Sequence, residues 1–157
     1  MTINIGLNKE QLQGVSAILN KVLANEFLLY TKSRNFHWNV VGHQFHDLHK
    51  FFESLYEGLD EIVDSVAERS RSLGENAFGT MTEFLKYTTL KETPGAYPKE
   101  LEMVRILLED IEQVIRELRV DVDIIQDKFK DAGTADFLTG IMETHEKNAW
   151  MLRSLLV

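Results

Sequence analysis

The 157-residue sequence is long enough for one domain whose core buries roughly two thirds of the unfolded chain's surface. Its 25 acidic and 17 basic residues leave a formal net charge of −8, which opposes binding to a phosphate backbone and favours cations as partners. The absence of cysteine excludes disulfides and thiolate chemistry, and without a signal peptide or a run of ~18 apolar residues we expect one cytoplasmic domain, residues 1–157, with no membrane span.

Apolar residues at helical spacing predict four long helices. The first begins at about Asn8, which forms a capping-box pair with Gln11, and runs to about Phe36, after which NVVG ends it. The second runs from about Gln44 to Leu73, with Gly74 as its C-terminal stop.

The segment that follows, GTMTEFLKYTTLKETPGAYP, is too broken for a long helix, and we expect a connection with one short helix near Thr82 to Leu85. A third helix is predicted from about Lys99 to Lys130 and a fourth from about Thr134 to Leu156, separated by DAGTAD. Two long pairs joined by a longer middle connection describe an all-α, ferritin-like four-helix bundle with one crossover.

The second helix carries polar residues on the side opposite its apolar face. At ~100° per residue, a narrow wedge of this helix contains His49, Glu53, Asp60 and Asp64, with Glu57 and Glu68 beside it. Most charged rows of this kind are solvated helix faces, and we favour that interpretation for Glu57, Asp60 and Glu61.

Asp64 and Glu68 lie one turn apart, a like-charge arrangement that costs about 0.2–0.5 kcal/mol unless a cation binds. Divalent iron accepts imidazole and carboxylate ligands, so His49 is a chemically suitable companion. His49 and Asp64 are, however, separated by about 22 Å of continuous helix at 1.5 Å per residue, too far to share a metal ion in one chain. Two copies packed antiparallel about a two-fold axis would bring these ends together and create two equivalent sites.

The remaining histidines each admit two interpretations. His37 can join His49 because the first helix ends where the second begins, or it can simply pack at a helix end beside Trp38. His43 and His46 are either an accessory metal patch or surface residues at the start of the second helix. His145 interrupts an apolar face, so we predict a hydrogen-bonded core or interface residue.

Three stretches, FHWNVVGHQFHDLH, LDEIVDSVAER and HEKNAWMLRSLL, resemble the Dps family of mini-ferritins, named as DNA-binding proteins from starved cells. The resemblance covers nearly the whole chain and implies a hollow dodecamer built from two-fold dimers, which oxidises Fe(II) and stores the Fe(III) mineral. It implies a ferroxidase centre of one or two iron ions, for which zinc can substitute. The implied ligands are His37 and His49 from one subunit and Asp64 and Glu68 from its partner. Glu53 stands where the family has an acidic ligand, commonly Asp.

The same resemblance suggests further roles. Trp38 matches an aromatic residue beside the centre that intercepts radicals, and hydrogen peroxide or oxygen is the implied oxidant, so that the cell is protected from oxidative damage. Asp127 and Asp136 match acids that line the iron-entry pores, whereas Ala132 departs from a third acid for which Asp131 can substitute. The alternative for these acids is a solvated turn and a helix N-terminus that favours negative charge.

Three other functions fit the sequence less well than a ferroxidase does. Family members that condense DNA usually carry a basic tail, and only Lys9 lies near the start here, so a nucleoid-associated DNA-protecting oligomer with little ferroxidase activity is the less favoured alternative. A ferritin or bacterioferritin centre within one bundle needs Glu-x-x-His pairs on two helices, and the sequence contains none. Matched ligands at all four positions argue against a purely structural or signalling oligomer.

Overall fold

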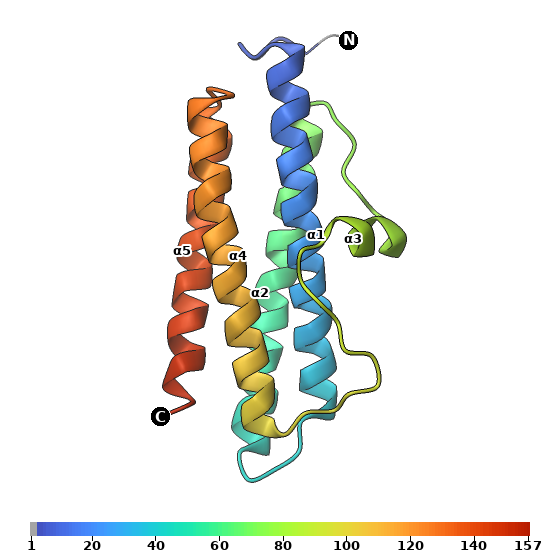
Figure 1. Cartoon of the computed structure of the whole chain (residues 1–157), viewed down its shortest axis with the longest axis vertical. Helices are drawn as coiled ribbons and strands as arrows, with labels where there is room; N and C mark the ends of the chain where they lie inside the picture. The colour runs from blue at the N-terminus through green and yellow to red at the C-terminus, as the bar shows by residue number, and fades with distance from the viewer. Residues whose placement is uncertain (1–2) are drawn as a thin grey trace.

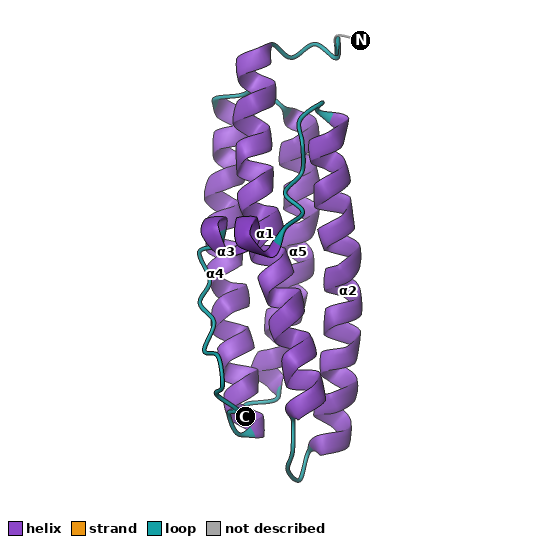
Figure 2. Ribbon diagram, turned by 90° about the vertical axis from the view of Figure 1, so that its right-hand side faces the viewer, coloured by secondary structure: helices purple, strands orange, loops and turns teal. Residues whose placement is uncertain are grey.

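The computed structural model describes residues 3–157, which form five α-helices connected by loops (Figures 1 and 2). The helices are α1 (Lys9–Asn39), α2 (Phe45–Ser72), α3 (Met81–Tyr87), α4 (Glu100–Asp127) and α5 (Ala132–Ser154). α1 and α2 form one antiparallel pair and α4 and α5 the other, and the long connection that joins the two pairs carries α3 and runs along the outer side of α1 (Figure 1). The predicted all-α bundle with one crossover is confirmed. Within the described residues, no helix combines the length and apolarity required to cross a membrane.

The start of the first helix agrees with the prediction, whereas its end lies further along. The Asn8 side chain accepts the Gln11 N–H at 2.9 Å, and the Gln11 side chain accepts the Asn8 N–H at 2.8 Å, which confirms the capping box. α1 continues three residues beyond Phe36, to Asn39, whose side-chain amide donates to the Asn35 carbonyl at 2.8 Å.

Other helix boundaries shifted where a cap or an unusual backbone conformation intervened. Gly74 has a φ of +87° and ends α2 as predicted. α4 ends at Asp127 rather than at Lys130, because Lys130 adopts a left-handed φ of +56°. α5 begins two residues earlier than Thr134, since the Asp131 carboxylate accepts the Thr134 N–H at 3.0 Å and caps the helix.

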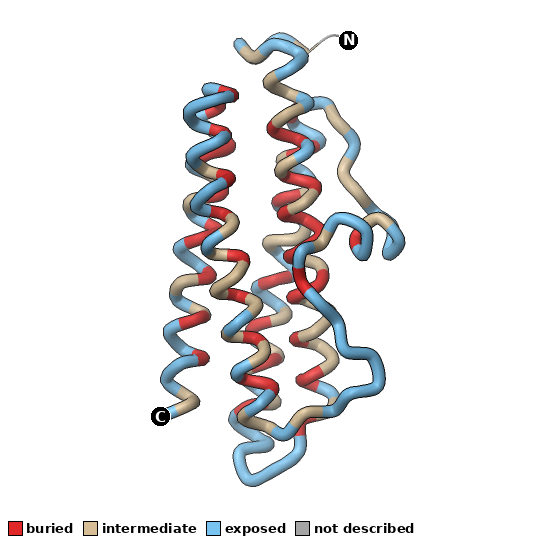
Figure 3. The backbone as a smooth tube through the Cα atoms, viewed as in Figure 1, coloured by how far each residue is buried: buried red, intermediate tan, exposed pale blue. Residues whose placement is uncertain are grey.

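The apolar faces of the four long helices meet in one core, where the buried residues lie on the inward sides of the helices (Figure 3). The core also contains a polar pair: the His145 Nε2 atom lies 2.9 Å from the Glu26 Oε1 atom, and both side chains have 0% exposure. His145 is therefore a hydrogen-bonded core residue, in agreement with the prediction.

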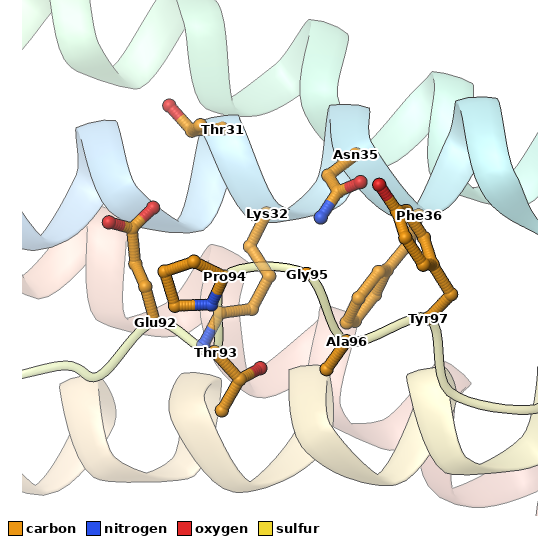
Figure 4. A pocket seen from close by; sticks show the side chains of 10 residues that line it. All are labelled: Thr31, Lys32, Asn35, Phe36, Glu92, Thr93, Pro94, Gly95, Ala96 and Tyr97. Carbon is orange, nitrogen blue, oxygen red and sulfur yellow. The ribbon is translucent and has the colours of Figure 1, made fainter.

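The crossover connection is attached to α1 by hydrogen bonds. The buried Asn25 side chain accepts the Thr89 N–H at 2.8 Å, and the Lys32 ammonium donates to the Lys91 carbonyl at 2.9 Å. Beyond these contacts, α1 and the connection enclose a pocket of about 160 Å³, seen between Lys32 and Tyr97 in Figure 4. No histidine or aspartate lines this pocket, so it does not correspond to the predicted metal centre.

Candidate metal centre

The turn between α1 and α2 brings two predicted ligands into contact. His37 lies in the last turn of α1 and His49 near the start of α2, and their rings stack with centroids 3.8 Å apart and planes inclined by 22°. His37 is buried, with 8% of its surface exposed, whereas His49 is partly exposed. Residues far apart in the sequence motif thus form one imidazole pair.

Reciprocal hydrogen bonds orient both rings. The His37 Nδ1 atom lies 2.8 Å from the His49 carbonyl oxygen, and the His49 Nδ1 atom lies 2.9 Å from the His37 carbonyl oxygen. A carbonyl can only accept, so each Nδ1 carries the proton, and in the neutral ring Nε2 keeps its lone pair. Metal-binding histidines are oriented by such bonds from the second ring nitrogen. The backbone bonds therefore orient both rings and leave the Nε2 lone pairs available.

The start of α4 holds the histidine turn in place. Gln44, the N-cap residue of α2, makes no side-chain cap; its backbone N–H instead donates to the Glu100 carboxylate at 3.2 Å. Gly42 has a φ of +142°, and a Cβ atom there would lie only 1.9 Å from the Glu100 Oε2 atom. Glycine is favoured at this position because residues with a side chain rarely adopt this φ, whereas the Glu100 carboxylate is the end of a flexible side chain that could move aside.

Glu53 places a carboxylate one helical turn beyond His49. Its Oε2 atom accepts a hydrogen bond from the Lys50 ammonium at 2.6 Å, and this bond lowers the pKa of the Glu53 carboxyl. The positive charges of nearby imidazolium forms would act in the same direction. Glu53 therefore presents an ionised carboxylate beside the histidine pair at neutral pH.

Asp64 and Glu68 remain apart from the histidines. Both are exposed near the far end of α2, and the helix is continuous from Phe45 to Ser72, so the axial distance of about 22 Å from His49 to Asp64 holds. In residues 3–157, neither carboxylate forms an ion pair with a side chain of its own chain. Nor do three or more His, Asp or Glu side chains of that range converge on one point suitable for a cation. One chain thus presents two halves of the predicted site.

An aromatic cluster that the sequence reasoning missed adjoins the histidine pair. The Tyr56 ring packs edge-on against His37 with centroids 5.3 Å apart, and the Arg34 guanidinium lies 4.6 Å from the Tyr56 centroid. The same guanidinium reaches Tyr30 at 5.4 Å and Trp38 at 5.6 Å. The spacing of four between Tyr30, Arg34 and Trp38 along α1 was the available signal.

The other predicted site residues lie elsewhere. His43 and His46 are both exposed, in the α1–α2 turn and the first turn of α2. Asp127 and Asp136 are exposed near the junction of α4 and α5, whereas Asp131 is 6% exposed. The Asp131 carboxylate caps α5 and lies 3.5 Å from the Arg69 guanidinium, so this acid already has structural partners.

The chain is similar to known proteins over almost its full length. A family model described as a ferritin-like domain matches residues 16–157. A low temperature-induced protein of Nostoc sp. is 53% identical, across 98% of this chain and 86% of its own length. The crystal structure of a Dps protein from Bacillus brevis has a TM-score of 0.90 at 36% identity, covering 96% of this chain and 100% of that one. A Dps structure from Vibrio cholerae has a TM-score of 0.91 at 28% identity, covering 100% of this chain and 98% of that one. It is described as a member of a broad superfamily of ferritin-like diiron-carboxylate proteins.

The helical bundle and the matching domain define the class of protein as ferritin-like. Within that class, the chain belongs to the Dps family. The predicted family and fold are thereby confirmed.

Proposed function

We propose that this protein is a cytoplasmic ferroxidase and iron-storage mini-ferritin, which oxidises Fe(II) with hydrogen peroxide or oxygen and stores Fe(III) mineral in a hollow homo-oligomer. The observation that carries the proposal is the division of the ligands along α2. Two imidazoles with available Nε2 atoms lie at one end, and two carboxylates that form no ion pair within residues 3–157 lie at the other. Membership of a ferritin-like family supports iron as the metal, and the Vibrio cholerae relative is described as one of the diiron-carboxylate proteins.

A second copy of the chain would complete the site. Antiparallel packing of α2 against the same helix of a partner brings His37, His49 and Glu53 of one subunit to Asp64 of the partner subunit and Glu68 of the partner subunit. The two-fold axis repeats the arrangement, so each dimer holds two sites. We extend the oligomer to a dodecamer, because the family resemblance implies one.

Each residue has a defined task in the proposed reaction. The carbonyl bonds fix the Nε2 atoms of His37 and His49 toward the metal, and carboxylates supply negative charge that holds Fe(II). Two Fe(II) ions give one electron each to one hydrogen peroxide, which takes up two protons and leaves as two waters. Because both electrons arrive together, no hydroxyl radical is released. Trp38, 68% exposed beside the pair, is suited to intercept any radical that escapes.

Iron must then enter the interior of the oligomer. We assign this role to the exposed carboxylates of Asp127 and Asp136 near the α4–α5 junction. Asp131 is the weakest member of the predicted pore set, because its carboxylate is committed to the α5 cap. Zinc, which shares imidazole and carboxylate ligands with iron, should occupy the centre and inhibit oxidation.

The test is to mix the metal-free protein with Fe(II) and hydrogen peroxide and to follow ferric absorbance. Wild type should oxidise iron rapidly and keep the brown product soluble. The double variant Asp64→Asn and Glu68→Gln should lose the fast phase by about a hundredfold or more while keeping its oligomeric mass. Glu57→Gln, a neutralised exposed acid on the same helix, is the matched control. An unchanged rate in the double variant would show that these acids do not bind the reacting iron.

A further inference from the structure

The Arg34 side chain is held in a fixed position without a carboxylate partner. Its guanidinium donates a hydrogen bond to the Tyr30 hydroxyl and lies over the rings of Tyr56 and Trp38. Across residues 3–157, no Asp or Glu oxygen lies within ion-pair distance of it. The hydrogen bond to Tyr30 raises the pKa of the Arg34 guanidinium, and the charge of Asp60 in the same chain acts weakly in the same direction from beyond ion-pair distance. An arginine ordered by tyrosine and tryptophan, with no ion pair in this range, has the composition typical of the centre of a protein interface. We call Arg34, Trp38 and Tyr56 the Arg34 ridge.

A groove of complementary character lies further along the same side of α2. Its volume is about 530 Å³. The α2 carboxylates of Asp60 and Asp64 line it, and Phe78, Met81 and Phe84 from the α3 region form an apolar wall. Asp60 is exposed, and Met81 is 59% exposed. We call this the α2–α3 groove; it offers negative charge beside apolar surface, which suits the cation and indole of the ridge.

The register of the proposed dimer places the ridge opposite this groove. In an antiparallel helix pair, each step forward on one helix is a step back on the other. If His49 faces Asp64 of the partner subunit and Glu68 of the partner subunit, then Tyr56 faces the partner's residues 57–61. A two-fold axis perpendicular to α2 also sets the α1 side of one subunit against the α1 side of the other. Since Arg34 lies on the Tyr56 ring, it meets the partner at Asp60.

We propose that the Arg34 ridge of one subunit docks into the α2–α3 groove of a second copy, where Arg34 pairs with Asp60 of the partner subunit and Trp38 packs on the apolar wall. This inference rests on the shared site of the proposed function and names the contacts that form it. Symmetry makes both contacts twice in each dimer. Aromatic and arginine anchors that insert into a pocket carry most of the binding energy of typical interfaces.

The pairing also has a consequence for the metal centre. The Arg34 guanidinium lies against Tyr56, which itself touches His37, so in an isolated chain its positive charge is separated from the imidazole pair by one aromatic ring. Docking brings a carboxylate of the partner to this guanidinium and offsets the repulsion. Assembly therefore raises metal affinity in two ways: it supplies the missing carboxylate ligands and it neutralises the neighbouring cation.

Charge reversal tests the pairing on the full-length, metal-free protein. Native mass spectrometry and sedimentation velocity at physiological salt give the concentration at which half of the assembly dissociates. Arg34→Glu and Asp60→Arg should each raise this concentration at least tenfold, because each places two like charges in contact. The double variant, which exchanges the charges, should recover most of the loss. Arg116→Glu is the control: it reverses an exposed arginine on α4 that also has no carboxylate partner within the described residues.

Two outcomes would overturn the inference. Either Arg34→Glu assembles like wild type, or both single variants dissociate without recovery in the double variant. Circular dichroism checks that each variant keeps its helices, and Arg34→Gln, which removes charge without reversing it, provides a milder second variant with an intermediate expected effect. The assay contains no iron. A wrong pairing can therefore be told apart from a wrong ferroxidase proposal. If the ferroxidase proposal is wrong, the wild-type protein assembles normally but oxidises iron no faster than buffer.

Discussion

The chain contains two histidine arrangements that use opposite ring nitrogens. At the α1–α2 turn, His37 and His49 commit Nδ1 to backbone carbonyls and leave Nε2 available. In the core, His145 commits Nε2 to Glu26, and no part of either side chain is exposed. On the proposed function, neither burial nor a nearby acid would therefore be enough to identify a metal-binding histidine. The free nitrogen must also face a place that a cation can reach.

The two helix pairs also differ in how many of their surface charges form ion pairs within the chain. On the outer faces of α4 and α5, opposite charges are paired within the chain, as in Arg119 with Glu146 and Arg153 with Glu112 at 2.6 Å. By contrast, Arg34 near the end of α1 and Asp64 toward the far end of α2 form no ion pair within residues 3–157. The helix pair α4–α5 thus pairs these surface charges internally, whereas α1 and α2 leave some of theirs without an ion pair in the described residues.

The largest expected effect concerns the core pair. Glu26→Ala removes the only hydrogen-bond partner that the buried His145 ring has in residues 3–157 and should destabilise the fold by about 3–5 kcal/mol. Glu26→Gln keeps an acceptor oxygen and should cost clearly less. Denaturant unfolding at fixed protein concentration measures both. If both substitutions lowered the free energy of unfolding by the same small amount, the hydrogen bond from His145 to Glu26 would not have the structural role assigned to it.

A smaller effect on stability, with a large effect on binding, is expected at the turn. His37→Ala should reduce Zn(II) affinity by at least the roughly 10–100-fold that is lost when only an outer hydrogen-bond partner of a ligand is removed. Calorimetric titration of the assembled protein measures this affinity. His43→Ala, an exposed histidine in the same turn, is the control and should bind zinc almost as wild type does. Similar losses in both variants would mean that the stacked pair is not the metal-binding one.

The smallest effect is a pH dependence in the second hairpin. Burial raises the pKa of the Asp121 carboxyl, and the Lys21 ammonium at 2.8 Å offsets only part of this shift. The folded chain then holds the Asp121 proton more tightly than the unfolded chain, so stability rises as pH falls through the interval between the two pKa values. Relative to Asp121→Asn, wild type should gain melting temperature on acidification, at about 2–4 °C per kcal/mol for a chain of this size. A constant difference between the two proteins across pH would contradict the assignment.

The sequence predicted the architecture well because its signals are local. The Asn8 cap and the Gly74 stop need only neighbouring residues, and apolar periodicity fixed the order of the helices. The end of α4 moved because Lys130 adopts a left-handed backbone conformation, which its residue type does not indicate. The start of α5 moved although its N-cap, Asp131, is as local a signal as Asn8, with its partner Thr134 three residues on.

The candidate site was predictable only in its residue types and spacing. The length of α2 already implied that His49 and Asp64 cannot meet within one chain. The reciprocal carbonyl bonds of the imidazoles left no trace in the sequence, because any residue supplies a carbonyl. The contact of Arg34 with Tyr56 joins two helices, and periodicity within one helix cannot show which helix packs beside it.

The contact between Glu100 and the histidine turn bears on how the protein is made. During synthesis, α1 and α2 leave the ribosome before α4 exists, and the N-terminal half of a chain begins to fold first. The carboxylate that receives the Gln44 N–H is absent until then. A nascent chain therefore cannot fix the turn between α1 and α2 in this way until α4 has been translated and has packed against the first two helices.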